Sequence, residues 1–383
     1  MHTKKTTMFK NVFVSIPLLF IFSSNIYAAP KIETWKTSQG TDVYYVHAPE
    51  LPMVDLRVVF DAGSSRDGEL PGLAMLTNGL LDQGAAGLNA DTISSGFESL
   101  GSIYGSDVGF DSASVQLRSL TDEKLLNQAL ENLTRVMSKP DFPEEAFARQ
   151  KSRTLIGIQA KQQSPGSLAR DAFMDAVYQS HPYANPNIGT EDSINKITRD
   201  DIINFYKTHY VSKNAMVAIV GAVYRKQAEQ IAETIISGLG AGEKAAPLSN
   251  VAALEQSNRI FIEHPSTQTH ILVGQPGVKR GDPDYFPLYV GNHVLGGGGM
   301  VSRLFEEVRE KRGLSYSAYS YFSPMRFKGP FIAGLQTKTE QVDEALSVLF
   351  ENIEKFIDEG PTEEELIASK KNITGGFPLR LDS

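Results

Sequence analysis

The spacing of hydrophobic positions predicts one series of secondary-structure elements that occurs twice along the chain. Each series opens with an alternating, β-branched segment, which begins at Val54 in the first copy and at Thr269 in the second. A helix, a second helix closed by Gly101 or Gly313, further strands and a long amphipathic helix follow in the same order. The apolar face of the long helix comprises Leu126, Ala129, Leu130, Leu133 and Val136 in the first copy and Val342, Ala345, Leu346, Leu349 and Ile353 in the second.

Local sequence matches support the duplication. Ala129 and Ala345 occupy matching places in similar helices, and Glu144 and Glu363 occupy matching places in similar helix starts, at nearly the same offset along the chain. Helices mixed with antiparallel strands favour the α+β class. We therefore predict two homologous α/β-sandwich domains, with their boundaries at residues 29–237 and 263–383 and a Gly- and Pro-containing linker at 238–262.

The second copy is shorter than the first. The first copy continues through a capping box at Thr198 and Asp201 to a strand, "AMVAIVGAV". The second copy, which runs to Ser383, contains no counterpart of the segment from about residue 169 to residue 223 of the first copy. We therefore expect the second domain to be truncated. A trimmed domain and a fragment of a longer chain are both open, and "GGFPLRLDS" favours a fragment because it stops where a helix should begin.

The segment 1–28 has the features of a secretory signal peptide. Three lysines precede an apolar run over residues 12–22, and small residues follow up to a cleavage site after Ala28. The run is shorter than the ~20 residues of a membrane-spanning helix, although an uncleaved anchor remains an alternative. Cleavage removes the three lysines and so changes the net charge from −8 to −11. Export without cysteine indicates the periplasm of a Gram-negative bacterium, with no stable membrane span after cleavage.

Composition narrows the chemistry. The chain has 383 residues, 37 basic and 45 acidic side chains and no cysteine. The absence of cysteine excludes a disulfide scaffold, a thiol nucleophile and thiolate metal sites. The net negative charge argues against nucleic acid as a partner, because phosphate binding needs a basic surface. It would suit basic peptides, but acidic periplasmic proteins are common without such a role.

Few reactive motifs are present. No two histidines of the mature chain are three or four residues apart, so no helix face offers a paired zinc site, and we expect structural or surface roles for them. The chain also lacks the G-x-S-x-G elbow of α/β-hydrolases. The segment "LGGGGMVSRLF" lacks the Lys-Ser/Thr of a phosphate loop and follows a helix, which favours a turn between two helices. Its four glycines would still allow close approach of an extended peptide.

One further segment, "SRLFEEVREKRGLSYSAYSYF", is rich in charged and aromatic residues. A solvated helix face that continues into an aromatic strand is one interpretation. In the other, Arg309 and Tyr316 point into one cleft, where a multi-donor cation and a hydroxyl donor hold peptide carbonyls or a developing oxyanion.

This segment closely resembles the C-terminal half-motif of the pitrilysin/insulinase family of zinc peptidases, which includes the mitochondrial processing peptidase subunits. The block that begins "HPYANPNIGTEDSINKITRDD" at His181 resembles the N-terminal domain of the same family. The resemblance covers essentially the whole mature chain. It implies two related α+β domains, joined by a linker, that close like a clamshell on a peptide.

Family enzymes carry an H-x-x-E-H motif on the helix after the first strands, in which two histidines bind zinc and the glutamate acts as general base. In the matching run "GLAMLTNGLL", Met75 and Gly79 replace the histidines and Asn78 replaces the glutamate. The third ligand should fall near Leu155, but residues 148–162 contain no acid. The resemblance therefore implies that this chain holds no zinc of its own.

The other half of the family's site is present. Arg309 and Tyr316 match the Arg and Tyr, in the same spacing, that C-terminal domains contribute to substrate binding. The glycines of the turn resemble the substrate-handling loop of the non-catalytic processing-peptidase subunit, and they are Gly296, Gly297, Gly298 and Gly299. The resemblance thus predicts the zinc-less subunit of a heterodimeric peptidase, with zinc in a homologous partner subunit and a peptide as substrate.

Two other functions remain open. In the first, the chain is a non-enzymatic binding or scaffolding protein with an inactive peptidase fold, and it cleaves no peptide with any partner. In the second, the chain is a lone metallopeptidase with unconventional zinc ligands, which stoichiometric zinc in the purified chain would indicate. The scattered histidines make the lone metallopeptidase the weakest of the three hypotheses.

Overall fold

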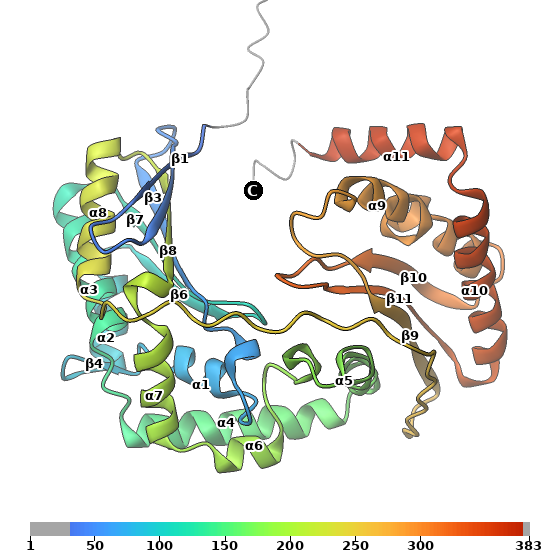
Figure 1. The fold of residues 1–383 in the computed structure, drawn as a ribbon, viewed down its shortest axis with the longest axis horizontal. Coiled ribbons are helices and arrows are strands. Elements are labelled where there is room, and N and C mark those ends of the chain that lie inside the picture. The colour runs from blue at the N-terminus through green and yellow to red at the C-terminus, as the bar shows by residue number, and fades with distance from the viewer. Residues whose placement is uncertain (1–30, 378–383) are drawn as a thin grey trace, which may run out of the picture. The chain divides into compact units, whose positions relative to one another are not determined.

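The computed structural model describes residues 31–377, and the expected signal peptide lies outside them. Within this range the first repeat forms a six-stranded mixed sheet in the order β1-β2-β8-β3-β7-β6, in which only the β2–β8 pair is parallel (Figure 1). The strands are β1 (Glu33–Lys36), β2 (Asp42–His47), β3 (Met53–Phe60), β6 (Ile103–Val108), β7 (Ala113–Leu120) and β8 (Ala215–Gly221). A short hairpin of β4 (Gly84–Ala85) and β5 (Leu88–Asn89) precedes α2.

Helices cover one face of this sheet. They are α1 (Leu73–Gly79), α2 (Ala90–Glu98), α3 (Glu123–Ser138) and α8 (Arg225–Ser237). Burial alternates along β3, so that Leu56 and Val58 join the core while Asp55 and Arg57 stay outside it. The five predicted apolar positions of α3 are all buried, because they form the stripe that faces this core.

The first repeat continues as a set of helices below the sheet. These are α4 (Glu144–Gln162), α5 (Pro165–Tyr178), α6 (Glu191–Lys196) and α7 (Arg199–His209). The predicted capping box at the start of α7 is confirmed: the Thr198 side chain accepts from the Asp201 backbone, and the Asp201 side chain accepts from the Thr198 backbone. Helix α7 packs against α1 and so supports the helix of the degenerate motif.

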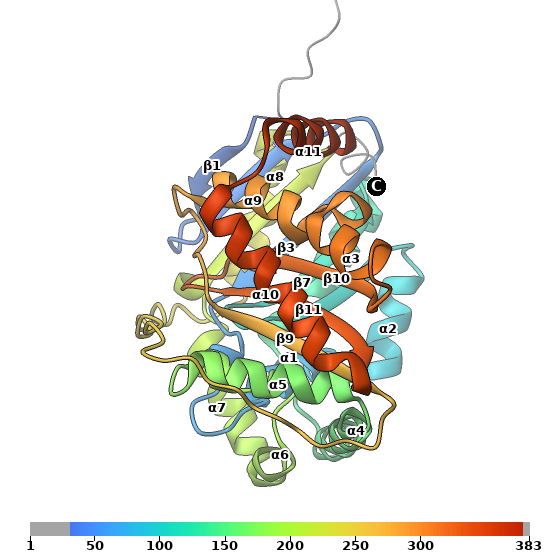
Figure 2. The same ribbon diagram turned by 90° about the vertical axis from the view of Figure 1, so that its right-hand side faces the viewer.

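The second repeat forms a separate antiparallel sheet in the order β10-β11-β9, with three strands among the described residues. The strands are β9 (Gln268–Pro276), β10 (Ser315–Phe322) and β11 (Pro330–Lys338). Helix α10 (Val342–Glu359) lies across one face (Figure 2), with α9 (Tyr285–Asn292) and α11 (Glu363–Gly376) beside it. Ala345 and Leu349 of α10 are buried and the other three predicted positions pack against the same core.

Two helical segments of the second repeat differ from expectation. The turn at His293–Gly297 and the turn at Phe305–Glu310 are π-helical, wider than the α-helices that the spacing predicts. The sequence could not reveal this difference because apolar spacing tolerates one extra residue per turn. Both π-helical turns pack on β10.

Helix α5 belongs to the first repeat by sequence, but it packs against β9 of the second (Figures 1 and 2). A Cβ at Gly274 on β9 would come within 2.9 Å of the Phe173 ring. The guanidinium of Arg170 donates to the Tyr321 hydroxyl at 3.0 Å. The second sheet therefore packs against a helix that lies before the linker in the chain.

Residues 238–262, the expected linker, form no helix or strand, but the first half of the segment is held in place by hydrogen bonds. Ser212 donates its backbone N–H to the Gly240 carbonyl at 2.8 Å, and Ala245 donates its own to Oδ1 of Asn214 at 3.0 Å. The segment thus runs as a fixed strap along the first repeat. Every helix within residues 31–377 is too short or too polar to cross a bilayer.

Candidate functional site

Asn78 on α1, where the resemblance places a general base, is 2% exposed and fully hydrogen-bonded. Its Nδ2 donates to the carbonyl oxygens of Asp107 at 3.2 Å and Ser114 at 3.5 Å, on β6 and β7. Its Oδ1 accepts from the hydroxyl of Tyr210 at 3.0 Å. A neutral amide does not take up a proton near pH 7, so Asn78 joins α1 to the sheet and cannot act as a base.

The other expected metal positions also lack suitable donors. A Cβ at Gly79 would lie 3.6 Å from Nε2 of Gln150, which precedes Leu155 on α4. Leu155 packs against the first core, and Met75 is half-buried on α1. These groups offer zinc a thioether and an amide but no imidazole or carboxylate, which is a poor match to its usual ligands. Across residues 31–377, no three His, Asp or Glu side chains are grouped to hold a metal ion.

The second repeat contains the counterpart of Asn78. Asn292, at the end of α9, donates to the Ser320 carbonyl at 2.9 Å and accepts from the Ser320 hydroxyl at 2.7 Å. The separation along the chain is 28 positions from Asn292 to Ser320 and 29 positions from Asn78 to Asp107, so the two asparagines make the equivalent contact in their repeats. At this position both repeats therefore have an asparagine whose side-chain amide donates to a strand carbonyl.

The histidine after Asn292 is also fixed by hydrogen bonds. Nδ1 of His293 lies 2.9 Å from the Ser369 hydroxyl, and Nε2 lies 3.2 Å from Oδ1 of Asn372, both on α11. Both ring nitrogens are therefore engaged with neutral groups, which agrees with the structural role expected for the histidines.

Arg309 and Tyr316, predicted as a pair, lie together. The guanidinium carbon of Arg309 is 4.6 Å from the centroid of the Tyr316 ring and 4.7 Å from that of Phe305, so the cation lies against both rings. Gly313, with φ +61°, reverses the chain, and its N–H donates to the Arg309 carbonyl at 2.9 Å. This reversal places the start of β10 beside the preceding helical turn and brings the two side chains into contact.

The pair is open to a ligand. Tyr316 is 83% exposed, and the nearest carboxylate to Arg309 in the described residues is that of Glu310, at 3.8 Å. A guanidinium stacked between rings keeps its N–H groups free along its edge, where they can donate to carbonyl or carboxylate oxygens. The arrangement is thus a donor-rich, preorganised surface for a polar backbone.

Gly296 and Gly297 end the first π-helical segment, and Gly298 and Gly299 follow it at the start of the next turn. A Cβ at Gly296 would clash with the backbone nitrogen of Ser320, and a Cβ at Gly298 would come within 2.6 Å of the His293 carbonyl. A Cβ at Gly297 would meet the Asn292 amide at 2.7 Å, whereas Gly299 (φ +59°) has open space around it. Gly296 therefore allows tight packing onto β10, Gly297 and Gly298 allow the chain to pass close to Asn292 and His293, and Gly299 allows the following turn.

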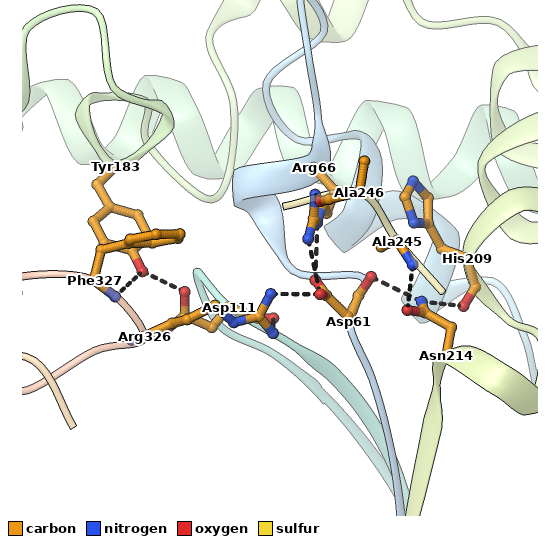
Figure 3. A network of polar contacts seen from close by, with 10 residues as sticks. All are labelled: Asp61, Arg66, Asp111, Tyr183, His209, Asn214, Ala245, Ala246, Arg326 and Phe327. Carbon is orange, nitrogen blue, oxygen red and sulfur yellow. Dashed lines mark hydrogen bonds and ion pairs between the residues drawn. The ribbon is translucent and has the colours of Figure 1, made fainter. Parts of the chain in front are cut away.

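A second polar cluster, which the sequence did not predict, joins the β10–β11 turn to the first repeat (Figure 3). Arg326 forms an ion pair with Asp61, and its backbone N–H donates to Oδ2 of Asp111 at 2.8 Å. Asp61 also receives two hydrogen bonds from Arg66, each 2.8 Å long. Burial alone would raise the pKa of Asp61, but the hydrogen bonds and charges of the two arginines outweigh it and hold that pKa below its usual value.

Next to this ion pair, Tyr183 donates to the Asp111 carboxylate, and burial together with that carboxylate raises the pKa of Tyr183. The cluster therefore fixes the β10–β11 turn through charge pairing. Asp111 and Arg326 are 215 positions apart, so no local sequence signal could have identified the cluster.

Both repeats match models of known protein families. Residues 42–191 match the model of the insulinase family (peptidase family M16), and residues 196–373 match that of the peptidase M16 inactive domain. The crystal structure of a peptidase M16 inactive domain from Pseudomonas fluorescens is 40% identical, with a TM-score of 0.88 over 90% of this chain and 84% of that chain. The α+β class and duplicated architecture are thereby confirmed.

Two curated relatives have lower identity. An uncharacterized zinc protease from Streptomyces coelicolor is 30% identical over 62% of this chain, and the match spans only 53% of that protein. A non-peptidase homolog from Helicobacter pylori is 26% identical over 88% of this chain and 78% of its own length. The chain therefore resembles proteins described both as peptidases and as non-peptidases.

Proposed function

Because the chain belongs to the insulinase family of peptidases (family M16) and carries the fold of its inactive domain, we propose that it is the zinc-less subunit of a heterodimeric metallopeptidase. A homologous partner subunit would supply zinc, the activated water and the general base for peptide hydrolysis. This chain would supply Arg309 and Tyr316 to the bound peptide. The signal-peptide features of residues 1–28 favour the periplasm as the location.

The observation that carries the proposal is the contrast between Asn78 and the Arg309–Tyr316 pair. Asn78 is buried and has every polar atom committed to β6, β7 and Tyr210. Arg309 and Tyr316 are stacked, with the tyrosine ring turned to solvent. A chain that served only as a packed scaffold would gain nothing from leaving such a donor pair open.

In the proposed reaction, Arg309 binds peptide carbonyl oxygens through its free edge. The Tyr316 hydroxyl donates to the oxygen of the scissile carbonyl as negative charge develops there. A preorganised donor of this kind is typically worth ~2.7–4 kcal/mol in the transition state. Gly296–Gly299 and the turn that they form would lie along the same peptide and limit its side chains by close backbone approach.

The test is cleavage of a fluorogenic peptide by the full chain co-purified with an M16 homologue that has an intact H-x-x-E-H motif, ideally one encoded in the adjacent reading frame. We expect Tyr316→Phe to lower kcat about 100-fold or more with little change in KM, because the lost donor acts mainly in the transition state. Arg309→Ala should raise KM, because its contacts form in the ground state as well.

Arg312→Ala is the matched control, since Arg312 follows Arg309 closely in the chain but forms an ion pair with Glu307 on the surface. It should leave both kinetic constants unchanged. Unchanged kcat/KM in both Tyr316→Phe and Arg309→Ala would overturn the proposed roles.

The name of the Helicobacter relative supports a second candidate, a binding or scaffolding protein without peptidase activity. That function predicts no cleavage with any zinc-bearing partner, together with an unchanged complex when Arg309 is replaced. Metal analysis of the purified chain addresses the third possibility, because stoichiometric zinc would indicate a lone metallopeptidase.

A further inference from the structure

The strap formed by the first half of the linker borders a cavity of about 640 Å³ against the first repeat. Its walls are the turn at Ser64–Arg66, the end of α7 at residues 207–209, and residues 242–248 of the strap. Figure 3 shows part of this wall, where Ala245 and Ala246 lie beside Arg66 and His209. A volume of this size is typical of small-ligand sites, and the wall contains neither Arg309 nor Tyr316.

The strap is held over the cavity by specific contacts. Arg66 donates to the Ala246 carbonyl at 2.6 Å, and Glu243 pairs with Lys213 at 2.8 Å. Together with the Ala245–Asn214 hydrogen bond, these contacts keep the chain in place although it has no secondary structure. The cavity is therefore bounded by ordered segments.

The wall carries an excess of positive charge. Arg66 is neutralised by Asp61, and the one carboxylate of the wall, Glu243, is neutralised by Lys213. Lys207 and Lys244 also line the cavity, and neither has a carboxylate partner within residues 31–377. Both lysines are exposed residues of the wall, and two cations without a carboxylate partner there favour an anion.

Two polar atoms of wall residues are buried without a hydrogen-bond partner among the described residues. They are Oγ of Ser65, a residue only 3% exposed, and Nδ1 of His209. Burial and the charge of Arg66 lower the pKa of His209, so its ring is neutral at pH 7 and can donate or accept. A buried polar atom without a partner costs ~1–3 kcal/mol, and because these two atoms have almost no accessible surface, a molecule in the cavity does not contact them.

We propose that this cavity binds a small organic anion, a molecule with a carboxylate or phosphate group. The anionic group lies near Lys207 and Lys244, which line the cavity. The site is separate from the proposed peptide-binding pair, so binding here does not depend on peptidase activity.

The test uses the full chain and ligand-observed NMR with three probes: succinate, its neutral analogue succinamide, and inorganic phosphate. Succinate should bind and succinamide should not, and binding of phosphate instead of succinate would assign the site to phosphate esters. The double variant Lys207→Gln/Lys244→Gln should weaken binding at least tenfold. Lys196→Gln, which removes an exposed lysine of α6 outside the wall, should not.

Ser65→Ala is a control at a buried position of the wall. The variant removes a hydroxyl that has no partner among residues 31–377 and almost no accessible surface, so it should leave thermal stability unchanged or raised and succinate binding unchanged. Equal binding of succinate and succinamide, binding of none of the three probes, or an unchanged affinity in the double lysine variant would overturn the proposal.

Discussion

The two repeats have the same order of elements but use it differently. Within the described residues the first sheet has six strands and the second has three, and the helix of the degenerate motif in the first repeat corresponds to α9 in the second. Both helices are fixed to their sheets by an asparagine, Asn78 or Asn292. The comparison teaches that the first repeat uses the same asparagine contact as the second at this position. The half-buried Arg309 and the exposed Tyr316, which form the donor pair, lie in the second repeat.

The largest expected effect comes from breaking that equivalence. Asn78→Ala removes an amide that is bonded to two strand carbonyls and leaves the buried Tyr210 hydroxyl without its acceptor, so we expect a loss of about 3 kcal/mol in the free energy of unfolding. Asn292→Ala should cost about 2 kcal/mol, because its partners lie on one residue, Ser320. Urea denaturation measures both, and a loss below about 1 kcal/mol for Asn78→Ala would contradict its structural role.

The next effect is a pH response of the first repeat. Asp67 accepts from the backbone N–H groups of Gly72 and Ala74 at the start of α1, yet burial raises its pKa to about 7. This folded-state pKa exceeds the ordinary value of 3.8. Protonated Asp67 therefore stabilises the fold fully below pH 3.8, and this contribution to the free energy of unfolding is lost as the pH rises through 7.

We expect the free energy of unfolding to fall by about 2 kcal/mol between pH 5 and pH 8, and Asp67→Asn to flatten that dependence. Denaturation at several pH values checks this result. An equal pH slope in the wild type and in Asp67→Asn would show that another group is responsible.

The smallest effect has the opposite sign and belongs to the second repeat. Glu365 pairs with Arg303 at 2.5 Å and caps α11, and the hydrogen bond from Arg303, against an opposing effect of burial, lowers the pKa of Glu365 to about 2. The stabilisation is therefore present above the unfolded value near 4.5 and is lost as the pH falls toward 2.

Because the Glu365 side chain is 30% exposed, water screens the pair, and we expect Glu365→Gln to cost about 1 kcal/mol at pH 7 and almost nothing at pH 2. Hydrogen exchange of α11 in the wild type and the variant would locate the loss. Ala146 holds the corresponding position in α4 and is apolar and buried, so acid should loosen α11 and leave α4 unchanged.

Local pattern predicted the repeated strands and helices well, because burial imposes a period of two on β3 and β9 and a period near 3.6 on α3 and α10. The motif around Arg309 and Tyr316 also indicated a pair, and a glycine at position 313 reverses the chain between them. The pattern did not predict the π-helical turns at His293–Gly297 and Phe305–Glu310, both of which pack on β10.

Contacts between segments that are distant in the chain could not be predicted from local sequence pattern. Asp61 and Arg326 are 265 residues apart, and their ion pair depends on where two loops end in space. The cavity under the strap was missed for a related reason: residues 238–262 have the composition of a mobile linker, and only their hydrogen bonds to Asn214 and Arg66 show that part of it is fixed. The equivalence of Asn78 and Asn292, in contrast, could have been found from the repeat spacing.

The position of α5 also bears on how the molecule is assembled during synthesis. Helix α5 ends at Tyr178, about 90 residues before β9 begins at Gln268, so it leaves the ribosome well before the strand on which it packs. The first half of the chain thus presents a surface for β9 before the second sheet exists. The order of translation favours the correct pairing, and the second repeat completes its sheet against a surface that its own residues do not encode.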